Sequence, residues 1–268
     1  MNNQPIGILD SGVGGLSIWK EIVKNLPHES TIYLADSINC PYGDRTEDEI
    51  YILAKRLVKF LLDKKVKLIV LACNTITVFC IDKLRIDFPN IPIVGTVPAV
   101  KTAAELTKSK KIGILSTEPT ARSEYQKDLI NKFAKGCFVI NKGESKLVPY
   151  IEKGDTKSEK IKKILRDSLK EFLAKDVDVI ALGCSHFPFL KDEIGEIMGD
   201  RVKILDSGEA IARQVKRVLI NNNHLSLSNN PSHIFYTTGN AKEFSKVSKK
   251  LLGDKFGNLI QSSYSVSL

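Results

Sequence analysis

Short, unbroken runs of apolar residues recur along this 268-residue chain, and stretches with helical spacing of apolar residues separate several of them. A strand with one face in water alternates polar and apolar residues, whereas a strand covered on both faces is apolar throughout. The runs therefore predict buried parallel strands joined by helices, which is an α/β fold. The predicted strands are IGIL (6–9), TIYLA (31–35), LIVLA (68–72), IPIVG (91–95), KIGIL (111–115), CFVI (137–140), DVIAL (178–182) and VKILD (202–206).

The clearest predicted helix begins at Thr46. Glu49 lies three residues further on, which is the spacing of a capping box, and apolar residues follow at helical spacing as far as Leu61. A second helix is predicted over residues 158–175, where lysines occupy the polar side. The polar stretch 221–230 predicts a loop.

Two strand-and-turn segments of the chain resemble each other. KLIVLACNT and DVIALGCSH align when Cys73 is placed on Cys184, 111 residues later, and the apolar positions of the two strands then coincide. The pentapeptide ILDSG also occurs twice, at residues 8–12 and at residues 204–208. We interpret the chain as two similar α/β halves, and a chance similarity between two buried strands is the alternative that the sequence leaves open.

Cys73 and Cys184 both lie where a predicted strand ends. Ligands of open α/β sheets bind beyond the carboxyl ends of the strands, so both cysteines are candidate site residues. DSGVGG (10–15) follows the first strand in the same way, and its glycines can let the backbone approach a ligand closely. This segment is neither a P-loop nor a GxGxxG motif, so a nucleotide site is not indicated.

Composition narrows the class of protein. Hydrophobic residues make up 43% and charged residues 26%, which is ordinary for a globular chain. The first residues do not follow the pattern of a signal peptide, and no apolar run approaches the roughly 18 residues of a membrane span. The net charge is +9, but no run of basic residues is interleaved with aromatic ones, so the sequence does not favour nucleic acid as a partner.

The five cysteines are scattered and form no CxxC pair. This spacing argues against a zinc site or a disulfide framework and favours a cytoplasm that keeps thiols reduced. Cys80 and Cys137 are interpreted as small core residues, and the sequence leaves Cys40 undecided.

Two thiols supplied by two facing halves suit the inversion of a stereocentre. One thiolate takes a proton from a carbon atom, and the other thiol returns a proton to the opposite face. An unperturbed thiol has a pKa of about 8.5, so lowering it to about 7 requires roughly 2 kcal/mol. A helix N-terminus can contribute up to about that amount, and we therefore expect a lowered pKa for a cysteine at a strand-to-helix turn.

Several motifs together closely resemble the glutamate racemases of the cofactor-independent aspartate/glutamate racemase superfamily. The resemblance runs from near the N-terminus to about residue 253. The motifs DSGVGG and PYG and the two cysteine motifs are highly specific in combination. The matching stretches are DSGVGG (10–15), PYG (41–43), ACNT (72–75), ST and TARSEY around 116–125, VPYIEKGD (148–155), GCSHFPFL (183–190), DSG (206–208) and YTTGN (236–240).

The resemblance implies two α/β domains that face each other across a cleft. Residues 1–97 and 208–268 would form the first domain, and residues 98–207 the second. The implied activity is conversion between L- and D-glutamate without pyridoxal phosphate or a metal ion, and D-glutamate is the form used in peptidoglycan synthesis. A cytoplasmic homodimer without a membrane or nucleic-acid partner is also expected.

The resemblance further implies roles for individual residues. Cys73 and Cys184 would be the acid/base residues, Cys184 taking the proton from L-glutamate and Cys73 from D-glutamate. Asp10, Glu152 and His186 would assist them. The residues implied to hold the substrate are Asp10, Ser11, Pro41, Tyr42, Gly43, Cys73, Asn74, Thr75, Thr117, Thr120, Cys184, Ser185 and His186.

Simpler roles remain open for some of these residues. Asp10 and Ser11 are also suitable caps for the following helix, His186 could be an ordinary helix-start residue, and Glu152 could be a surface carboxylate.

Two residues depart from the family pattern. Ser185 replaces the usual threonine, which keeps the hydroxyl and removes a methyl group, and Ile76 replaces the usual alanine. Other functions also stay open. A racemase of aspartate or another small acidic amino acid would use the same chemistry in a shorter pocket, whereas a non-catalytic amino-acid sensor would not need the thiols.

Overall fold

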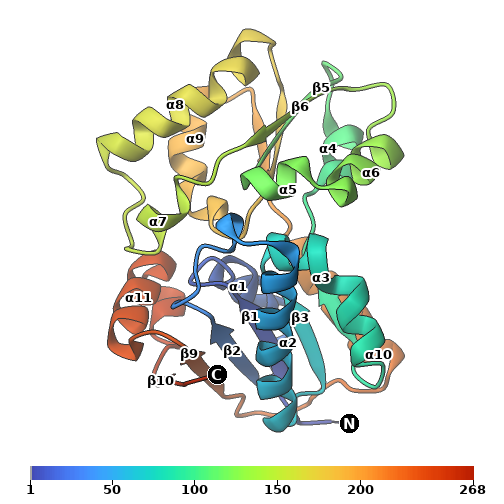
Figure 1. Cartoon of the computed structure of the whole chain (residues 1–268), viewed down its shortest axis with the longest axis vertical. Helices are drawn as coiled ribbons and strands as arrows, with labels where there is room; N and C mark the ends of the chain where they lie inside the picture. Colours follow the sequence, from blue (N-terminus) through green and yellow to red (C-terminus); the bar gives the residue numbers. More distant parts are fainter. Residues whose placement is uncertain (1) are drawn as a thin grey trace.

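The computed structural model describes residues 2–268, which form two parallel β-sheets flanked by helices (Figure 1). The first sheet has the order β10-β9-β2-β1-β3-β4 and the second the order β6-β5-β7-β8, and every strand pair is parallel. The predicted fold class, two similar parallel-sheet α/β units, is confirmed. The strands are β1 (Ile6–Asp10), β2 (Thr31–Ala35), β3 (Leu68–Leu71), β4 (Ile93–Gly95), β5 (Lys111–Ser116), β6 (Phe138–Gly143), β7 (Val179–Gly183), β8 (Lys203–Leu205), β9 (His233–Thr237) and β10 (Ser263–Ser265).

Helices cover both faces of the first sheet, which with these helices is called the first lobe. One hydrophobic cluster joins the sheet to α1 (Leu16–Asn25), α10 (Gly208–Asn221) and α11 (Ala241–Gly257). Another joins the opposite face to α2 (Glu47–Asp63) and α3 (Asn74–Asp87). Because both faces are covered, β1, β2 and β3 are buried at every position, which explains their unbroken apolar sequence.

The second sheet and its helices, called the second lobe, are built in the same way. The short helix α7 (Val148–Ile151), with α8 (Glu159–Ala174) and α9 (Lys191–Met198), packs on one face, and α4 (Val100–Leu106) and α6 (Glu124–Phe133) pack on the other. The remaining elements, α5 (Glu118–Arg122) and the 3-10 helices η1 (Tyr42–Asp44) and η2 (Phe187–Leu190), lie toward the junction of the lobes in Figure 1.

The chain passes from the first lobe to the second and back again. Strands of the first sheet come from residues 6–95 and 233–265, and strands of the second come from residues 111–205. The predicted domain division, with its limits at residues 97 and 208, stays a prediction.

Local predictions were right for all eight strands, with ends shifted by up to three residues. The capping box is present, since the Thr46 hydroxyl accepts from Glu49 N–H and the Glu49 carboxylate accepts from Thr46 N–H. The strands β9 and β10 were missed. Only part of β9 is buried and β10 lies at the sheet edge with exposed residues, so neither has an unbroken apolar sequence. Within residues 2–268, no helix combines the length and apolarity that crossing a bilayer requires.

Candidate active site

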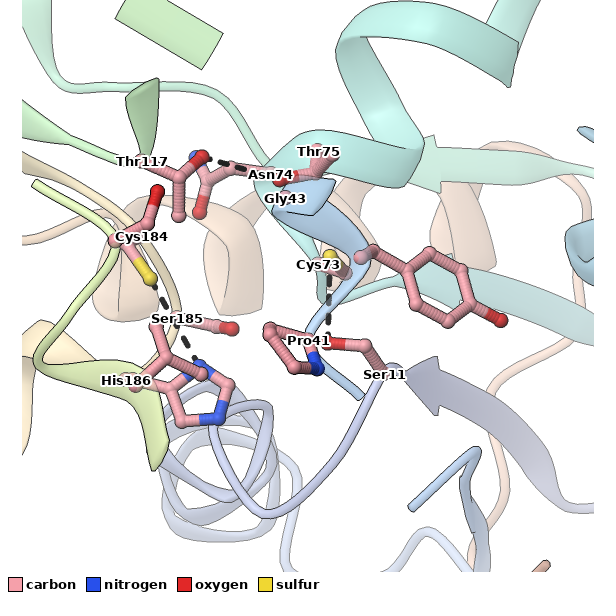
Figure 2. Close-up of a pocket in the computed structure, with 13 residues that line it drawn as sticks. Ser11, Pro41, Gly43, Cys73, Asn74, Thr75, Thr117, Cys184, Ser185 and His186 are labelled. Atoms are coloured by element: carbon pink, nitrogen blue, oxygen red, sulfur yellow. Dashed lines mark hydrogen bonds between the residues drawn. The ribbon is translucent and has the colours of Figure 1, made fainter. Parts of the chain in front are cut away.

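A small cavity lies at the carboxyl ends of strands from both lobes. The first lobe contributes Ser11 after β1 and Cys73 after β3, and the second contributes Cys184 after β7. Figure 2 shows the thiols of Cys73 and Cys184 on opposite sides of this space. The lining residues are Ser11, Pro41, Tyr42, Gly43, Cys73, Asn74, Thr75, Thr117, Ser145, Val148, Cys184, Ser185 and His186.

Cys73 is the N-cap residue of α3 and is 5% exposed. Its Sγ lies 3.8 Å from Ser11 Oγ. Burial, reinforced by the nearby carboxylate of Asp10, raises the pKa of the Cys73 thiol to about 12, and the amide of Ile76 at the helix start offsets this only in part. The expected lowering of the pKa by the helix N-terminus is therefore wrong for Cys73, because desolvation of the thiolate costs more than the amide contributes.

Cys184 lies within a chain of polar contacts in the second lobe. Its Sγ is 3.8 Å from Nδ1 of His186, and Nε2 of His186 is 2.5 Å from Oε1 of Glu152. Burial by itself lowers the pKa of His186, but hydrogen bonds with Cys184, Cys40 and Glu152 together raise this pKa well above the usual histidine value. The raised pKa favours the protonated, positively charged form of His186 beside the Cys184 sulfur.

Glu152 follows α7 and turns its side chain inward, with 18% of that side chain exposed. Its Oε1 also accepts a hydrogen bond from the backbone N–H of Val13 at 2.8 Å, across the junction of the lobes. The alternative of a surface carboxylate is thereby excluded. Glu152 does not line the cavity itself, and it is linked to the Cys184 thiol through His186.

Asp10 ends β1 and has no exposed surface. Its Oδ1 accepts from Gly12 N–H at 2.9 Å, and its Oδ2 accepts from the Ser185 hydroxyl at 2.9 Å. Burial raises the pKa of Asp10, and the positive charge of His186 opposes that rise. Asp10 does not line the cavity itself, and it contacts the lining residue Ser185.

The glycines after β1 make room for side chains of the other lobe. A Cβ on Gly12 would lie 2.0 Å from Glu152 Oε1, and one on Gly14 would lie 2.4 Å from Nδ1 of His186. The sequence had suggested that these glycines allow close approach of a ligand. In the structure they allow Glu152 and His186 of the second lobe to approach the first lobe, while the approach of a ligand stays a prediction.

Threonine hydroxyl groups of the two lobes meet at the cavity. Thr75 Oγ1 lies 3.2 Å from Thr117 Oγ1 and 3.4 Å from Thr120 Oγ1, and so links the two lobes. Thr120 accepts a hydrogen bond from Thr117 Oγ1 at 2.9 Å and does not line the cavity. Tyr42 also lines the cavity, and its hydroxyl donates to Asp36.

The sequence prediction therefore agrees with most of the lining. Of the predicted residues, Asp10, Thr120 and Glu152 do not line the cavity, and the others do. Ser145 and Val148 line it but were not predicted. Val148 belongs to the VPYIEKGD stretch, which was a usable signal, whereas nothing in the sequence around Ser145 indicated its position.

Comparison with known proteins gives a consistent result. Residues 6–215 match the family model described as Asp/Glu/Hydantoin racemase. A glutamate racemase of Clostridium novyi is 40% identical over 255 residues, covering 94% of this chain and 98% of that protein. Among solved structures, a glutamate racemase isoform of Bacillus anthracis has a TM-score of 0.90 at 30% identity, covering 100% of this chain and 99% of its own.

A second solved structure, a Francisella tularensis glutamate racemase in complex with D-glutamate, has a TM-score of 0.85 at 30% identity, covering 100% of this chain and 98% of its own. Sequence and structure thus agree along nearly the whole chain, and the protein belongs to the Asp/Glu/hydantoin racemase family.

Proposed function

We propose that this protein interconverts L- and D-glutamate by transferring a proton at Cα between two thiols. The observation that carries the proposal is the placement of Cys73 and Cys184, which follow equivalent strands of the two lobes and lie on opposite sides of one cavity (Figure 2). A thiol on each face of a planar carbanion is the arrangement that inversion requires. The names of the relatives described above support glutamate as the substrate.

The surroundings of the two thiols favour one resting state. Cys73, with its pKa raised to about 12, carries its proton at neutral pH. Cys184 Sγ lies 3.8 Å from Nδ1 of His186, the nearest ionisable ring in the cavity. Cys184 is then the base that takes the proton from L-glutamate, and Cys73 is the acid that supplies a proton to the opposite face. The reverse reaction needs the opposite protonation states.

The cavity offers polar partners for an acidic amino acid. Ser11, Thr75 and Ser145 supply hydroxyl groups, Asn74 supplies an amide, and His186 supplies positive charge. None of the lining residues that the structure describes is Lys or Arg. We infer that the substrate carboxylates are held by hydroxyl and amide donors, with His186 as the nearby cation.

Substrate entry requires the lobes to separate. The cavity is small, with a volume of about 20 Å³, which is room for little more than one water molecule. Contacts that would break on opening include the hydrogen bond from Ser17 Oγ to the carbonyl of Ser185, at 2.7 Å. The geometry therefore corresponds to a closed state that excludes water around the reacting carbon.

Incubation with L-glutamate in deuterated water tests the proposed function. Circular dichroism follows the loss of optical activity, and mass spectrometry follows deuterium at Cα. Racemisation with uptake of one deuterium is expected, and a parallel incubation with L-aspartate measures the closest alternative substrate. Absence of both signals with glutamate would remove the proposal, while faster reaction of aspartate would replace the substrate.

We also propose that the enzyme is a cytoplasmic homodimer that supplies D-glutamate for peptidoglycan. All five cysteines are free thiols, which supports a reducing compartment. Sedimentation equilibrium tests the dimer, and complementation of a D-glutamate auxotroph tests the cellular role.

A further inference from the structure

Three side chains of different chemistry converge beside the cavity. Cys40 precedes η1, Glu152 follows α7 and His186 follows β7, so they come from distant parts of the sequence. Their donor atoms, one sulfur, one carboxylate oxygen and one ring nitrogen, all lie within 4.8 Å of one another. We propose that Cys40, Glu152 and His186 form a binding site for zinc, and that zinc bound there inhibits the enzyme.

The donor set has the chemistry that zinc prefers. Thiolate, imidazole and carboxylate are its usual protein ligands, at about 2.3, 2.0–2.1 and 2.0–2.2 Å. In a tetrahedron of that size the ligand atoms are about 3.3–3.7 Å apart, so side-chain adjustments of roughly 1 Å complete the site. Three protein ligands leave a fourth position for water or a substrate carboxylate, as in zinc sites that are open on one side.

The surroundings hold these ligands in place. His186 is 2% exposed and Cys40 is half-buried, so neither side chain moves freely in solvent. Cys40 Sγ also lies 3.9 Å from Ser11 Oγ, and Glu152 accepts a hydrogen bond from Val13 N–H. Partners of this kind fix the orientation of metal ligands.

Occupancy of the site would stop the proposed reaction. On binding, the Cys40 thiol and the His186 imidazolium each release a proton to solvent, and the freed lone pairs bond to the metal. The metal takes a ring nitrogen of His186 that otherwise bonds Glu152 or Cys184, so the chain of contacts Cys184–His186–Glu152 is broken. This inhibition rests on the proposed function, whereas metal binding itself does not.

Cobalt(II) is the probe for binding, because thiolate-to-cobalt charge-transfer bands report a cysteine ligand directly. The full-length protein is first dialysed against a chelator, and we expect it to remain active because the proposed reaction uses no metal. Cobalt should then give a thiolate band and an intense visible spectrum typical of four-coordination. Zinc should abolish both the spectrum and the activity, while Mg²⁺ should do neither because it prefers oxygen ligands.

The decisive comparison is Cys40→Ser with Cys137→Ser as the matched control. Cys137 is also a free, half-buried cysteine, and it lies before β6, away from the cavity. Loss of a residue that merely orients a ligand costs about 10–100-fold in metal affinity, so loss of the Cys40 ligand should weaken zinc inhibition and cobalt binding at least about tenfold. Cys137→Ser should change neither, and each variant is compared with its own metal-free rate.

The competing site consists of the two cavity thiols, Cys73 and Cys184. If Cys40→Ser keeps the cobalt band at unchanged affinity and Cys184→Ala removes it, the proposal is overturned. It is equally overturned if the wild-type protein gives no cobalt band. A band that depends on Cys40 in a protein without racemase activity would support the metal site and remove the proposed function. A Cys40-dependent band without zinc inhibition would remove the inhibitory role.

Discussion

The hydroxyl of Ser185 connects the two lobes at the site, and its contribution can be isolated. Ser185 Oγ donates to Asp10 Oδ2 at 2.9 Å, and Asp10 has no exposed surface. Ser185→Thr keeps this donor and adds a methyl group, whereas Ser185→Val has nearly the same shape as threonine and lacks the donor. The difference between the two variants therefore measures the hydroxyl group rather than the change in volume.

The expected magnitude follows from the burial of Asp10. A buried acceptor left without its donor costs about 1–3 kcal/mol. If this cost falls on the closed catalytic state, it corresponds to roughly 5–150-fold in kcat/KM. We expect Ser185→Thr to remain active, because threonine is the usual residue in the family, and Ser185→Val to be slower by that factor.

Initial rates by circular dichroism, measured with each enantiomer of glutamate, give kcat/KM, and thermal unfolding shows that both variants are folded. In an Asp10→Asn background the difference between threonine and valine at position 185 should shrink, because the two sites are coupled through one hydrogen bond. Equal kcat/KM for the two variants in the otherwise wild-type protein would refute this account of Ser185.

Three further predictions concern the site. Cys73→Ala and Cys184→Ala should each abolish net racemisation. Cys184→Ala should still exchange the Cα proton of D-glutamate slowly with solvent, and Cys73→Ala should exchange that of L-glutamate. Deuterium uptake by each enantiomer checks this, and substantial racemisation by either variant would contradict it. The raised pKa of His186 means that its protonated form is fully present below the usual histidine pKa and is lost as the pH rises through the raised value. Glu152→Gln removes one cause of that rise, so the alkaline fall in the rate should begin at lower pH, and an unchanged pH–rate profile would count against the contact. Gly14→Ala would place a Cβ 2.4 Å from His186, so activity should fall strongly while a folded protein remains detectable by circular dichroism; full activity would show that the lobes need not approach so closely.

Local patterns in the sequence were sufficient to predict the α/β class and the positions of the two thiols. Strands buried on both faces must be apolar throughout, so β1, β3 and β7 are visible in the sequence. The repeat around Cys73 and Cys184 then places both thiols at carboxyl ends of parallel strands, where ligands of such sheets bind. The family resemblance added the identity of the surrounding residues.

Contacts between residues distant in the sequence were decided only by the tertiary structure. The high pKa of Cys73 arises from desolvation between packed lobes, which no local pattern records. Ser185 was expected to hold the substrate, and the structure shows that its hydroxyl donates to Asp10 in the other lobe. Cys40, Glu152 and His186 also come together only through folding, because they belong to separate elements, and a sequence motif reveals only ligands that are close along the chain.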